Sequence, residues 1–127
     1  MSQAKVLTAA DVMTSKVVTK GPSDDLARIA SEMENRNIGS IVIVENQKVV
    51  GILTDRDLAK VVEKVGALLD KNLAKHYMVR PVITVQIDTP ITEITKLMKE
   101  KHIRHVVVLD KDQTLAGVIS LRDITKL

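Results

Sequence analysis

Cysteine and aromatic residues are almost missing from this chain of 127 residues. There is no cysteine, which excludes a disulfide scaffold, a zinc–thiolate centre and a thiol nucleophile, and which fits an intracellular, cytoplasmic protein. Tyr77 is the only aromatic side chain, so a stacking platform for single-stranded nucleic acid is excluded. A planar ligand would therefore have to lie between aliphatic side chains.

Long apolar runs and a strong charge of one sign are also absent. No run approaches the roughly 20 apolar residues that span a bilayer, and the N-terminus lacks the apolar stretch of a secretory signal. The formal net charge of +3 is scattered along the chain. With 45% hydrophobic and 28% charged residues, the composition indicates one soluble domain with a core and no membrane partner. We expect the basic residues Lys71, Lys75, His76 and Arg80 to form a solvated face rather than a nucleic-acid footprint.

What the chain does contain is an internal repeat. The segment from Val17 to Asp57 returns about 65 residues later as the segment from Val82 to Asp123. Each copy ends in the same polar motif, a glycine followed three residues later by a hydroxyl residue and six residues later by aspartate. The two endings are Gly51-x-x-Thr54-x-x-Asp57 and Gly117-x-x-Ser120-x-x-Asp123. A tandem repeat with matching polar endings predicts a pseudo-twofold molecule with paired sites.

Each repeat predicts the order strand, helix, strand, strand, helix. The β-branched runs Val17–Thr19 and Val82–Thr84 are the predicted first strands. Ser23 is expected to cap the first helix. In the second copy we expect Thr89 to cap a helix that has Pro90 at its first position.

The apolar runs that follow predict a hairpin in each repeat. Ile41–Val44 and Val49–Leu53 flank a polar turn, and the second copy has its turn at Asp110–Thr114. Because these runs do not alternate, both faces of each sheet are expected to be covered. We therefore predict an α/β (α+β) fold in which two β-α-β-β-α repeats pack sheet to sheet. A helix from Leu58 through Leu69 is expected to join the two halves.

These motifs resemble a tandem cystathionine-β-synthase (CBS) domain pair, or Bateman module, over residues 8 to 127. The resemblance places the CBS repeats at residues 8–63 and 74–127, with a helical connector at residues 64–73. The second terminal motif is similar to the last such motif in the γ subunit of AMP-activated protein kinase. The resemblance implies that AMP, ADP, ATP or a related adenosyl compound binds in the clefts between the repeats, and that the modules pair as homodimers.

The terminal motifs suit this chemistry on physical grounds as well. An ionised carboxylate can accept hydrogen bonds from both hydroxyls of a ribose, which is the role expected for Asp57 and Asp123. Thr54 and Ser120 lie at predicted strand-to-helix turns, beside free backbone N–H groups that suit a phosphate. The same spacing also fits a helix capping box, and the hydroxyls can serve both purposes.

The resemblance builds each adenosyl site from both repeats, with aliphatic side chains on either side of the adenine. One pocket combines Thr54 and Asp57 with Ile83, Ile103, Arg104 and His105, and the other combines Ser120 and Asp123 with Val18, Ile38 and Gly39. The pair Arg104-His105 is predicted to contact phosphate, the alternative being an exposed basic pair at the start of a strand. The first repeat has Gly39-Ser40 at that place, so the two sites are not equivalent. Arg56 and Arg122 either reach phosphate or pair with a carboxylate, and the sequence leaves this choice open.

Metal binding and catalysis are not expected. His102 and His105 have the spacing of two metal ligands on a helix, but no third ligand lies nearby. Asp55 and Asp57 are accompanied by no base, nucleophile or acid of suitable geometry, so neither an enzymatic activity nor a catalytic cofactor is predicted. The valines and leucines from Val61 to Leu73 belong either to the core or to a partner interface.

Two functions of different classes remain. The first is a non-catalytic regulatory module that binds an adenosine-containing ligand and acts on an effector protein in trans, since the sequence ends at Leu127 within the last helix. The alternative is a structural or nucleic-acid-associated interaction protein whose clefts are vestigial. A strong salt dependence of binding to DNA or RNA would indicate the alternative.

Overall fold

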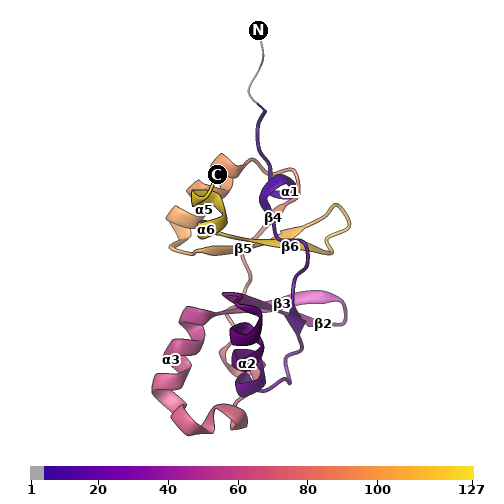
Figure 1. The fold of residues 1–127 in the computed structure, drawn as a ribbon. Coiled ribbons are helices and arrows are strands. Elements are labelled where there is room, and N and C mark those ends of the chain that lie inside the picture. Colours follow the sequence, from indigo (N-terminus) through magenta and orange to yellow (C-terminus); the bar gives the residue numbers. More distant parts are fainter. Residues whose placement is uncertain (1–4) are drawn as a thin grey trace. The chain divides into compact units, whose positions relative to one another are not determined.

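The computed structural model describes residues 5–127, which form two compact units (Figure 1). The central unit is the continuous segment Val18–Val82. The terminal unit combines the described residues before Val18 with Ile83–Leu127. Each unit has its own sheet and its own hydrophobic core, and the two are described separately below.

Both units have the predicted order of elements. The central unit consists of β1 (Thr19–Lys20), α2 (Leu26–Arg36), β2 (Ser40–Glu45), β3 (Lys48–Thr54), α3 (Asp55–Val65), the 3₁₀ helix η1 (Gly66–Lys71) and α4 (Ala74–Tyr77). The terminal unit consists of α1 (Ala9–Val12), β4 (Thr84–Gln86), α5 (Ile91–Lys101), β5 (His105–Leu109), β6 (Leu115–Ser120) and α6 (Leu121–Thr125). The sheets run β1-β2-β3 and β4-β5-β6, each with one parallel and one antiparallel pairing. The predicted α/β fold class is confirmed.

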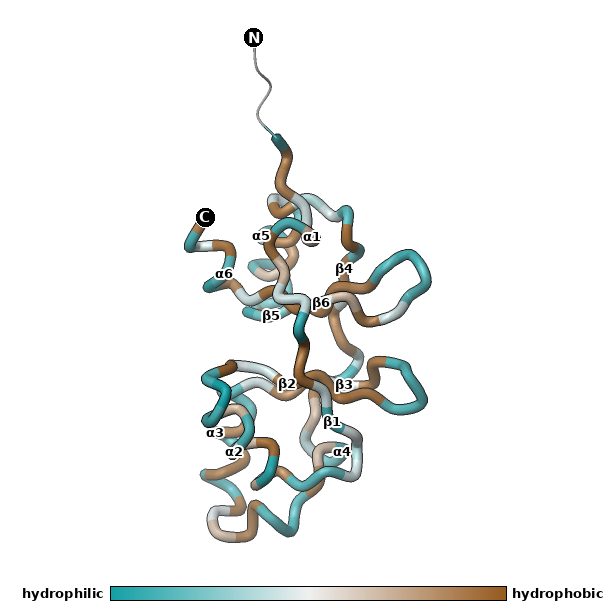
Figure 2. The backbone as a smooth tube through the Cα atoms, turned by 45° about the vertical axis from the view of Figure 1, so that its right-hand side comes forward, coloured by the Kyte–Doolittle hydropathy of each residue, from teal (hydrophilic) through white to brown (hydrophobic). Residues whose placement is uncertain are grey.

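The hairpin of each unit forms where apolar strands meet a polar turn. Asn46 and Gln47 turn the chain between β2 and β3 with φ angles of 52° and 66°, the left-handed conformation that two-residue hairpins require. In Figure 2 both hairpin turns are hydrophilic, and the strands that lead into them are largely hydrophobic. The turn between β5 and β6 is longer, and the Asp110 carboxylate accepts hydrogen bonds from the backbone N–H groups of Asp112 and Thr114 within it.

The cores come from one face of each long helix and from the middle strand of each sheet. Leu26, Ile29 and Met33 are buried on α2, as the helical spacing predicts, and Ile91, Ile94 and Met98 are buried at the matching positions on α5. Ile41, Val42 and Ile43 are all fully buried, although successive strand side chains point to opposite faces of a sheet. Burial of one such aliphatic side chain contributes about 1.5–3 kcal/mol, so these runs dominate the stability of both units.

The expected caps of the two long helices are wrong. Asp25, not Ser23, caps α2, because its side chain accepts a hydrogen bond from the N–H of Arg28 at 2.9 Å. Pro90 occupies the N-cap position of α5 in an extended conformation, so this helix begins one residue later than expected and has no side-chain cap. Thr89 instead accepts a hydrogen bond from the N–H of Gln86 at 3.0 Å, which closes the turn after β4.

Three boundaries also differ from the sequence-based expectation. The first strands start later than the β-branched runs, at Thr19 and Thr84, which are the first residues with a register partner on the middle strand. The helix that begins at the end of β3 stops at Val65, because Gly66 adopts a φ of 51°. The chain continues in η1, whose Leu69 packs on the central core while Leu68 is 59% exposed.

The short helices α1 and α4 pack in a way that the repeat alone does not predict. Met13 and Thr14 follow α1, and Thr14 exchanges backbone hydrogen bonds with Val118 of β6 at 2.9 and 3.1 Å. After α4, Val79 makes the same exchange with Ile52 of β3 at 2.9 and 3.2 Å. In Figure 1 the indigo α1 accordingly lies with the yellow and orange elements of the terminal unit. Each sequence repeat therefore begins with a segment that packs in the unit formed mainly by the other repeat. We call these two segments the head segments: α1 with Met13 and Thr14, and α4 with Met78 and Val79.

A methionine of each head segment lies against a glycine of the strand that it crosses. Met13 packs against Gly117 of β6, and Met78 packs against Gly51 of β3. The glycine of each Gly-x-x-(Thr/Ser)-x-x-Asp motif is thus required for packing, because it lets the head segment approach the strand. No helix within residues 5–127 is long and apolar enough to cross a membrane.

Candidate functional site

The candidate residues of the central unit gather at one end of its sheet. Thr54 ends β3 opposite Ser40, and the N–H of Asp55 donates to the carbonyl of Gly39 at 3.0 Å. The carbonyl of Val18 accepts from β2 at 3.3 Å, so the chain before β1 reaches the same end of the sheet. We call Val18, Ile38, Gly39, Thr54 and Asp57 the central set.

The terminal unit repeats this arrangement with different side chains. Ser120 ends β6 opposite His105, and the N–H of Leu121 donates to the carbonyl of Arg104 at 2.7 Å. The carbonyl of Ile83 accepts from Val107 of β5 at 3.2 Å. We call Ile83, Ile103, Arg104, His105, Ser120, Arg122 and Asp123 the terminal set. Each unit thus brings its own candidate residues together, whereas the combination of residues from both repeats in one pocket stays a prediction.

The hydroxyl and the aspartate of each motif form a capping box. In the central set, the Thr54 hydroxyl oxygen accepts from the N–H of Asp57 at 3.2 Å, and Asp57 Oδ2 accepts from the N–H of Thr54 at 2.9 Å. In the terminal set, Ser120 Oγ accepts from the N–H of Asp123 at 3.1 Å, and Asp123 Oδ2 accepts from the N–H of Ser120 at 2.9 Å. The capping interpretation of both motifs is therefore confirmed.

Capping does not use all the hydrogen-bonding capacity of these side chains. Each aspartate makes its capping bonds through Oδ2, and Oδ1 of Asp57 and of Asp123 has no hydrogen-bond partner in the part of the chain that the structure describes. Both carboxylates are only half-buried. A carboxylate oxygen that is fixed in place and still open to solvent is a ready acceptor for a sugar hydroxyl.

The two helix N-termini differ in one backbone donor. At α3 the N–H of Arg56 donates to the side chain of Asp55 at 2.8 Å. At α6 the residue in the position of Asp55 is Leu121, which has no acceptor, so the N–H of Arg122 lacks this partner. The start of α6 therefore keeps a backbone donor that the start of α3 uses internally.

The basic side chains of the candidate sets all belong to the terminal unit and lie near the end of its sheet. Arg104 is exposed, and His105 is half-buried as the first residue of β5. Neither Arg56 nor Arg122 forms an ion pair with a carboxylate among the described residues, so the carboxylate alternative for these two arginines is not observed.

The two histidines of the terminal unit do not share a helix face. Helix α5 ends at Lys101, and His102 follows in a left-handed conformation with a φ of 55°, so the chain has already turned before His105. Within residues 5–127, no group of three or more His, Cys, Asp and Glu side chains is placed to hold a metal ion.

Comparison with known proteins gives matches along both repeats. A family model described as the CBS domain matches residues 9–64 and again residues 74–127. An uncharacterized protein of Methanopyrus kandleri is 36% identical over 118 residues, which are 92% of this chain and 60% of that protein. The inosine-5′-monophosphate dehydrogenase of Methanocaldococcus jannaschii is 30% identical over 119 residues, which are 93% of this chain and 23% of that enzyme. The chain thus spans only part of the length of these two relatives.

One solved structure has both the fold and a bound ligand of the expected class. It is a CBS domain pair in complex with 5′-methylthioadenosine and S-adenosyl-L-methionine, which is 26% identical to this chain with a TM-score of 0.84. The match covers 96% of this chain and 95% of that one.

Proposed function

The chain belongs to the CBS domain family, with two CBS domains in tandem, and we propose that it is a non-catalytic regulatory module for an adenosine-containing ligand. The observation that carries the proposal is the pair of capping boxes, each of which leaves Oδ1 of an aspartate open at the end of a sheet. The CBS pair that was crystallised with two adenosyl compounds supports the same ligand class.

The aspartates are the proposed ribose ligands. In both sets the capping bonds through Oδ2 fix the carboxylate plane, so Oδ1 of Asp57 and of Asp123 is preorganised to accept a ribose hydroxyl. A hydrogen bond to a charged acceptor contributes about 1.5–3 kcal/mol. Loss of this bond would therefore weaken binding about ten- to a hundredfold.

Aliphatic side chains are the proposed contacts of the adenine ring. Val18 and Ile38 of the central set and Ile83 and Ile103 of the terminal set are all half-buried, so each keeps apolar surface for a ligand. The only aromatic side chain, Tyr77, packs on the central core and is not part of either set. Adenine recognition is thus expected to depend on aliphatic contacts rather than on aromatic stacking.

The proposed phosphate contacts lie mainly on the terminal unit. Arg104 and His105 can supply positive charge, while Gly39 and Ser40 at the matching place supply none. The hydroxyl of Ser120 and the open N–H of Arg122 are further donors at the start of α6, whereas the hydroxyl of Thr54 already donates to Asp57 Oδ2 at 2.9 Å and would have to turn from it to reach a phosphate. AMP, ADP and ATP are therefore the first candidate ligands, and adenosine, which has no phosphate, is the uncharged ligand for comparison.

The module is proposed to act on an effector protein in trans and to form a homodimer. Val62 on α3 is 46% exposed and Leu68 on η1 is 59% exposed, so apolar surface of the central unit is available for association. A stable dimer is expected to bury at least about 1,200 Å². Light scattering at tens of micromolar protein would show a mass of two chains, and a monomer there would contradict the dimer.

Titration calorimetry tests the proposed function directly. The full chain is titrated with AMP, ADP, ATP, adenosine, S-adenosyl-L-methionine and 5′-methylthioadenosine, and at least one of them is expected to bind. The variant D57N/D123N keeps an acceptor for each cap but loses both charges, so it should bind that ligand at least about tenfold more weakly. D70N on η1 is the control, because its exposed carboxylate belongs to neither set. Absence of binding to every compound would leave the capping boxes as purely structural features.

A further inference from the structure

A groove of about 440 Å³ lies on the terminal unit between β4 and α5. Its strand side is formed by Thr84, Val85 and Gln86 with Thr89, and its helix side is formed by Glu93, Lys96, Leu97 and Glu100. Val85 and Leu97 pack on the core of the terminal unit and make part of the lining apolar. The groove shares no residue with the central or the terminal set.

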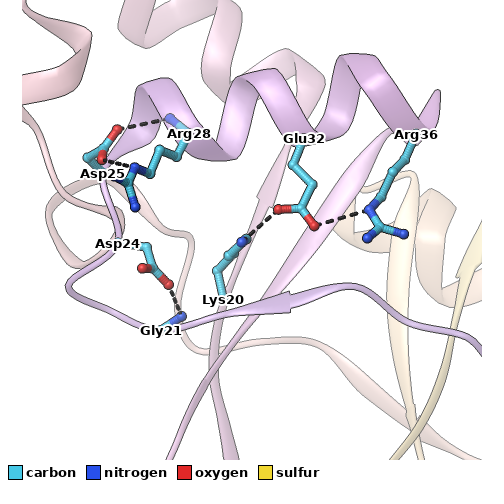
Figure 3. A network of polar contacts seen from close by, with 7 residues as sticks. All are labelled: Lys20, Gly21, Asp24, Asp25, Arg28, Glu32 and Arg36. Atoms are coloured by element: carbon cyan, nitrogen blue, oxygen red, sulfur yellow. Dashed lines mark hydrogen bonds and ion pairs between the residues drawn. The ribbon is translucent and has the colours of Figure 1, made fainter.

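At the corresponding place on the central unit, an ion pair connects the strand to the helix. About 65 residues before Val85 and Leu97, the repeat has Lys20 on β1 and Glu32 on α2. Figure 3 shows the Lys20 side chain reaching across to Glu32, with Nζ lying 2.6 Å from Oε2. The other oxygen of Glu32 accepts from Nε of Arg36 at 3.1 Å. The side chain of Lys20 thus occupies the space between β1 and α2.

The terminal unit lacks this bridge but keeps carboxylates on the helix. Glu93 and Glu100 lie seven positions apart on α5, about 10 Å along the helix axis. Neither they nor Lys96 between them form an ion pair within residues 5–127. Together the three side chains leave one net negative charge on the rim. A length of about 10 Å corresponds to about three residues of extended chain.

The strand beside the groove is an edge strand. The sheet order places β4 at the edge, paired only with β5. The carbonyl of Ile83 and the N–H of Ile87 bond to β5, so the backbone of Thr84 faces away from it. The N–H of Gln86 is already bonded to Thr89, which leaves the N–H and C=O of Thr84 as the edge groups that another chain can pair with.

We propose that this groove binds an extended segment of a partner protein that presents a lysine or arginine side chain. The cation would pair with Glu93 and Glu100, its aliphatic stem would lie on Leu97, and the segment backbone would pair with Thr84. Lys20 is the internal template for this occupant, because it places a lysine between the matching strand and helix of the central unit. The net negative charge that Glu93, Lys96 and Glu100 leave on the rim complements a cationic segment.

The first test is an NMR titration of the ¹⁵N-labelled full chain with the blocked peptide acetyl-Val-Lys-Val-amide. Amide shifts are expected at Thr84–Gln86 and along Glu93–Glu100, and none at Thr19–Gly21, where the ion pair occupies the matching place. The peptide acetyl-Val-Glu-Val-amide is the control and should not shift these amides. Equal shifts with both peptides, or shifts confined to other parts of the chain, would overturn the proposal.

Charge variants give the second test. E93Q/E100Q changes exposed side chains only and should weaken binding of the lysine peptide about fivefold. E34Q/E63Q is the matched control, since both of its glutamates are exposed and lie outside the groove. The proposal is wrong if E93Q/E100Q binds the lysine peptide as the wild type does.

Transplanting the ion pair gives a third test that uses the repeat. V85K/L97E rebuilds the pair of Lys20 and Glu32 in the terminal unit and should abolish peptide binding. K20V/E32L should not create binding on the central unit, because the positions that match Glu93 and Glu100 there are Arg28 and Asn35. Because Val85 contributes to the core, thermal melting must first show that V85K/L97E is folded, and E93Q/E100Q decides the question if it is not. Shifts of the same amides that grow with protein concentration, without peptide, would mean that a second copy occupies the groove and would overturn the proposal.

Discussion

The thioether of Met13 lies so close to Gly117 that a Cβ on that glycine would stand 2.6 Å from Sδ and 2.8 Å from the carbonyl oxygen of Thr14. At Gly51 the matching Cβ would stand 2.5 Å from Sδ of Met78, and its three nearest neighbours all belong to that side chain. A side chain added at Gly117 would therefore clash with both a backbone carbonyl and a side chain, whereas one added at Gly51 would clash with the side chain of Met78 alone.

Alanine at these glycines should destabilise the protein to different extents. G117A is expected to cost about 1–3 kcal/mol through overpacking, and G51A less, because a rotamer change of Met78 relieves the two shortest contacts, to Sδ and Cγ, and leaves the contact to its Cβ at 2.9 Å. Urea unfolding measures both, with G21A as the control, since its nearest neighbour would lie at 3.7 Å. The cost of G117A should fall in the background of M13A, and a purely additive pair would contradict the contact.

The two roles of Asp57 can be separated by comparing two substitutions. D57A removes the Asp57 half of the capping box and the proposed ribose acceptor, so it should cost about 1 kcal/mol in stability and weaken ligand binding about ten- to a hundredfold. D57N keeps an oxygen acceptor for the N–H of Thr54, so it should lose affinity with a much smaller loss of stability. Calorimetry and thermal melting together check this. If D57N melts like the wild type and also binds like it, Asp57 only caps α3.

Arg104 should distinguish charged from uncharged adenosyl ligands. Because the side chain is exposed, we expect R104A to weaken AMP binding by about 1–2 kcal/mol, or about five- to thirtyfold, and to leave adenosine binding unchanged. R104K keeps the charge and should recover part of the affinity, and raising the salt concentration should reduce the difference between R104A and the wild type. Equal losses for AMP and adenosine would show that Arg104 acts through packing alone.

Asp110 should make the stability of the terminal unit depend on acid pH. The hydroxyl of Thr114, and then the N–H groups of Thr114 and Asp112, hold the pKa of Asp110 below its ordinary value of 3.8. The stabilising contribution of a carboxylate with a lowered pKa is complete above the unfolded pKa, here about 4, and is lost as the pH falls through the folded pKa. The difference in urea midpoint between the wild type and D110N should therefore shrink between about pH 7 and about pH 3. D112N, in the same turn, is the control. If the difference in urea midpoint between the wild type and D110N stays constant with pH, the charge of Asp110 does not stabilise the terminal unit.

Local patterns were sufficient to predict most of the fold. The spacing of Leu26, Ile29 and Met33 predicts α2, and the apolar runs predict the hairpins, because these elements depend on interactions close in sequence. The sequence predicts Ser23 as the cap of α2, but Asp24 and Asp25 before Leu26 are equally good cap residues. The choice between them depends on which carbonyl the N–H of Leu26 reaches, and that carbonyl belongs to Asn72, far along the chain.

The candidate site was predicted at the level of motifs rather than of geometry. The spacing of Thr54 and Asp57 allowed a cap or a ligand contact, and the structure shows that the cap uses only one carboxylate oxygen. The packing of the head segments was not predicted, although Met13 and Met78 lie 65 residues apart and mark it in the sequence. A repeat shows which segments are alike, but it does not show which copy of the sheet each segment packs against.

The packing of the head segments also sets where the chain can be cut for expression. A fragment that ends before Ala74 contains β3 but not α4, so Gly51 would lose the methionine that lies against it and Ile52 would lose its backbone partner Val79. The contiguous stretch 18–82 keeps every element of the central unit in one polypeptide. The compact central unit of this protein therefore corresponds to a circular permutation of the sequence repeat, with the head segment after the strands instead of before them.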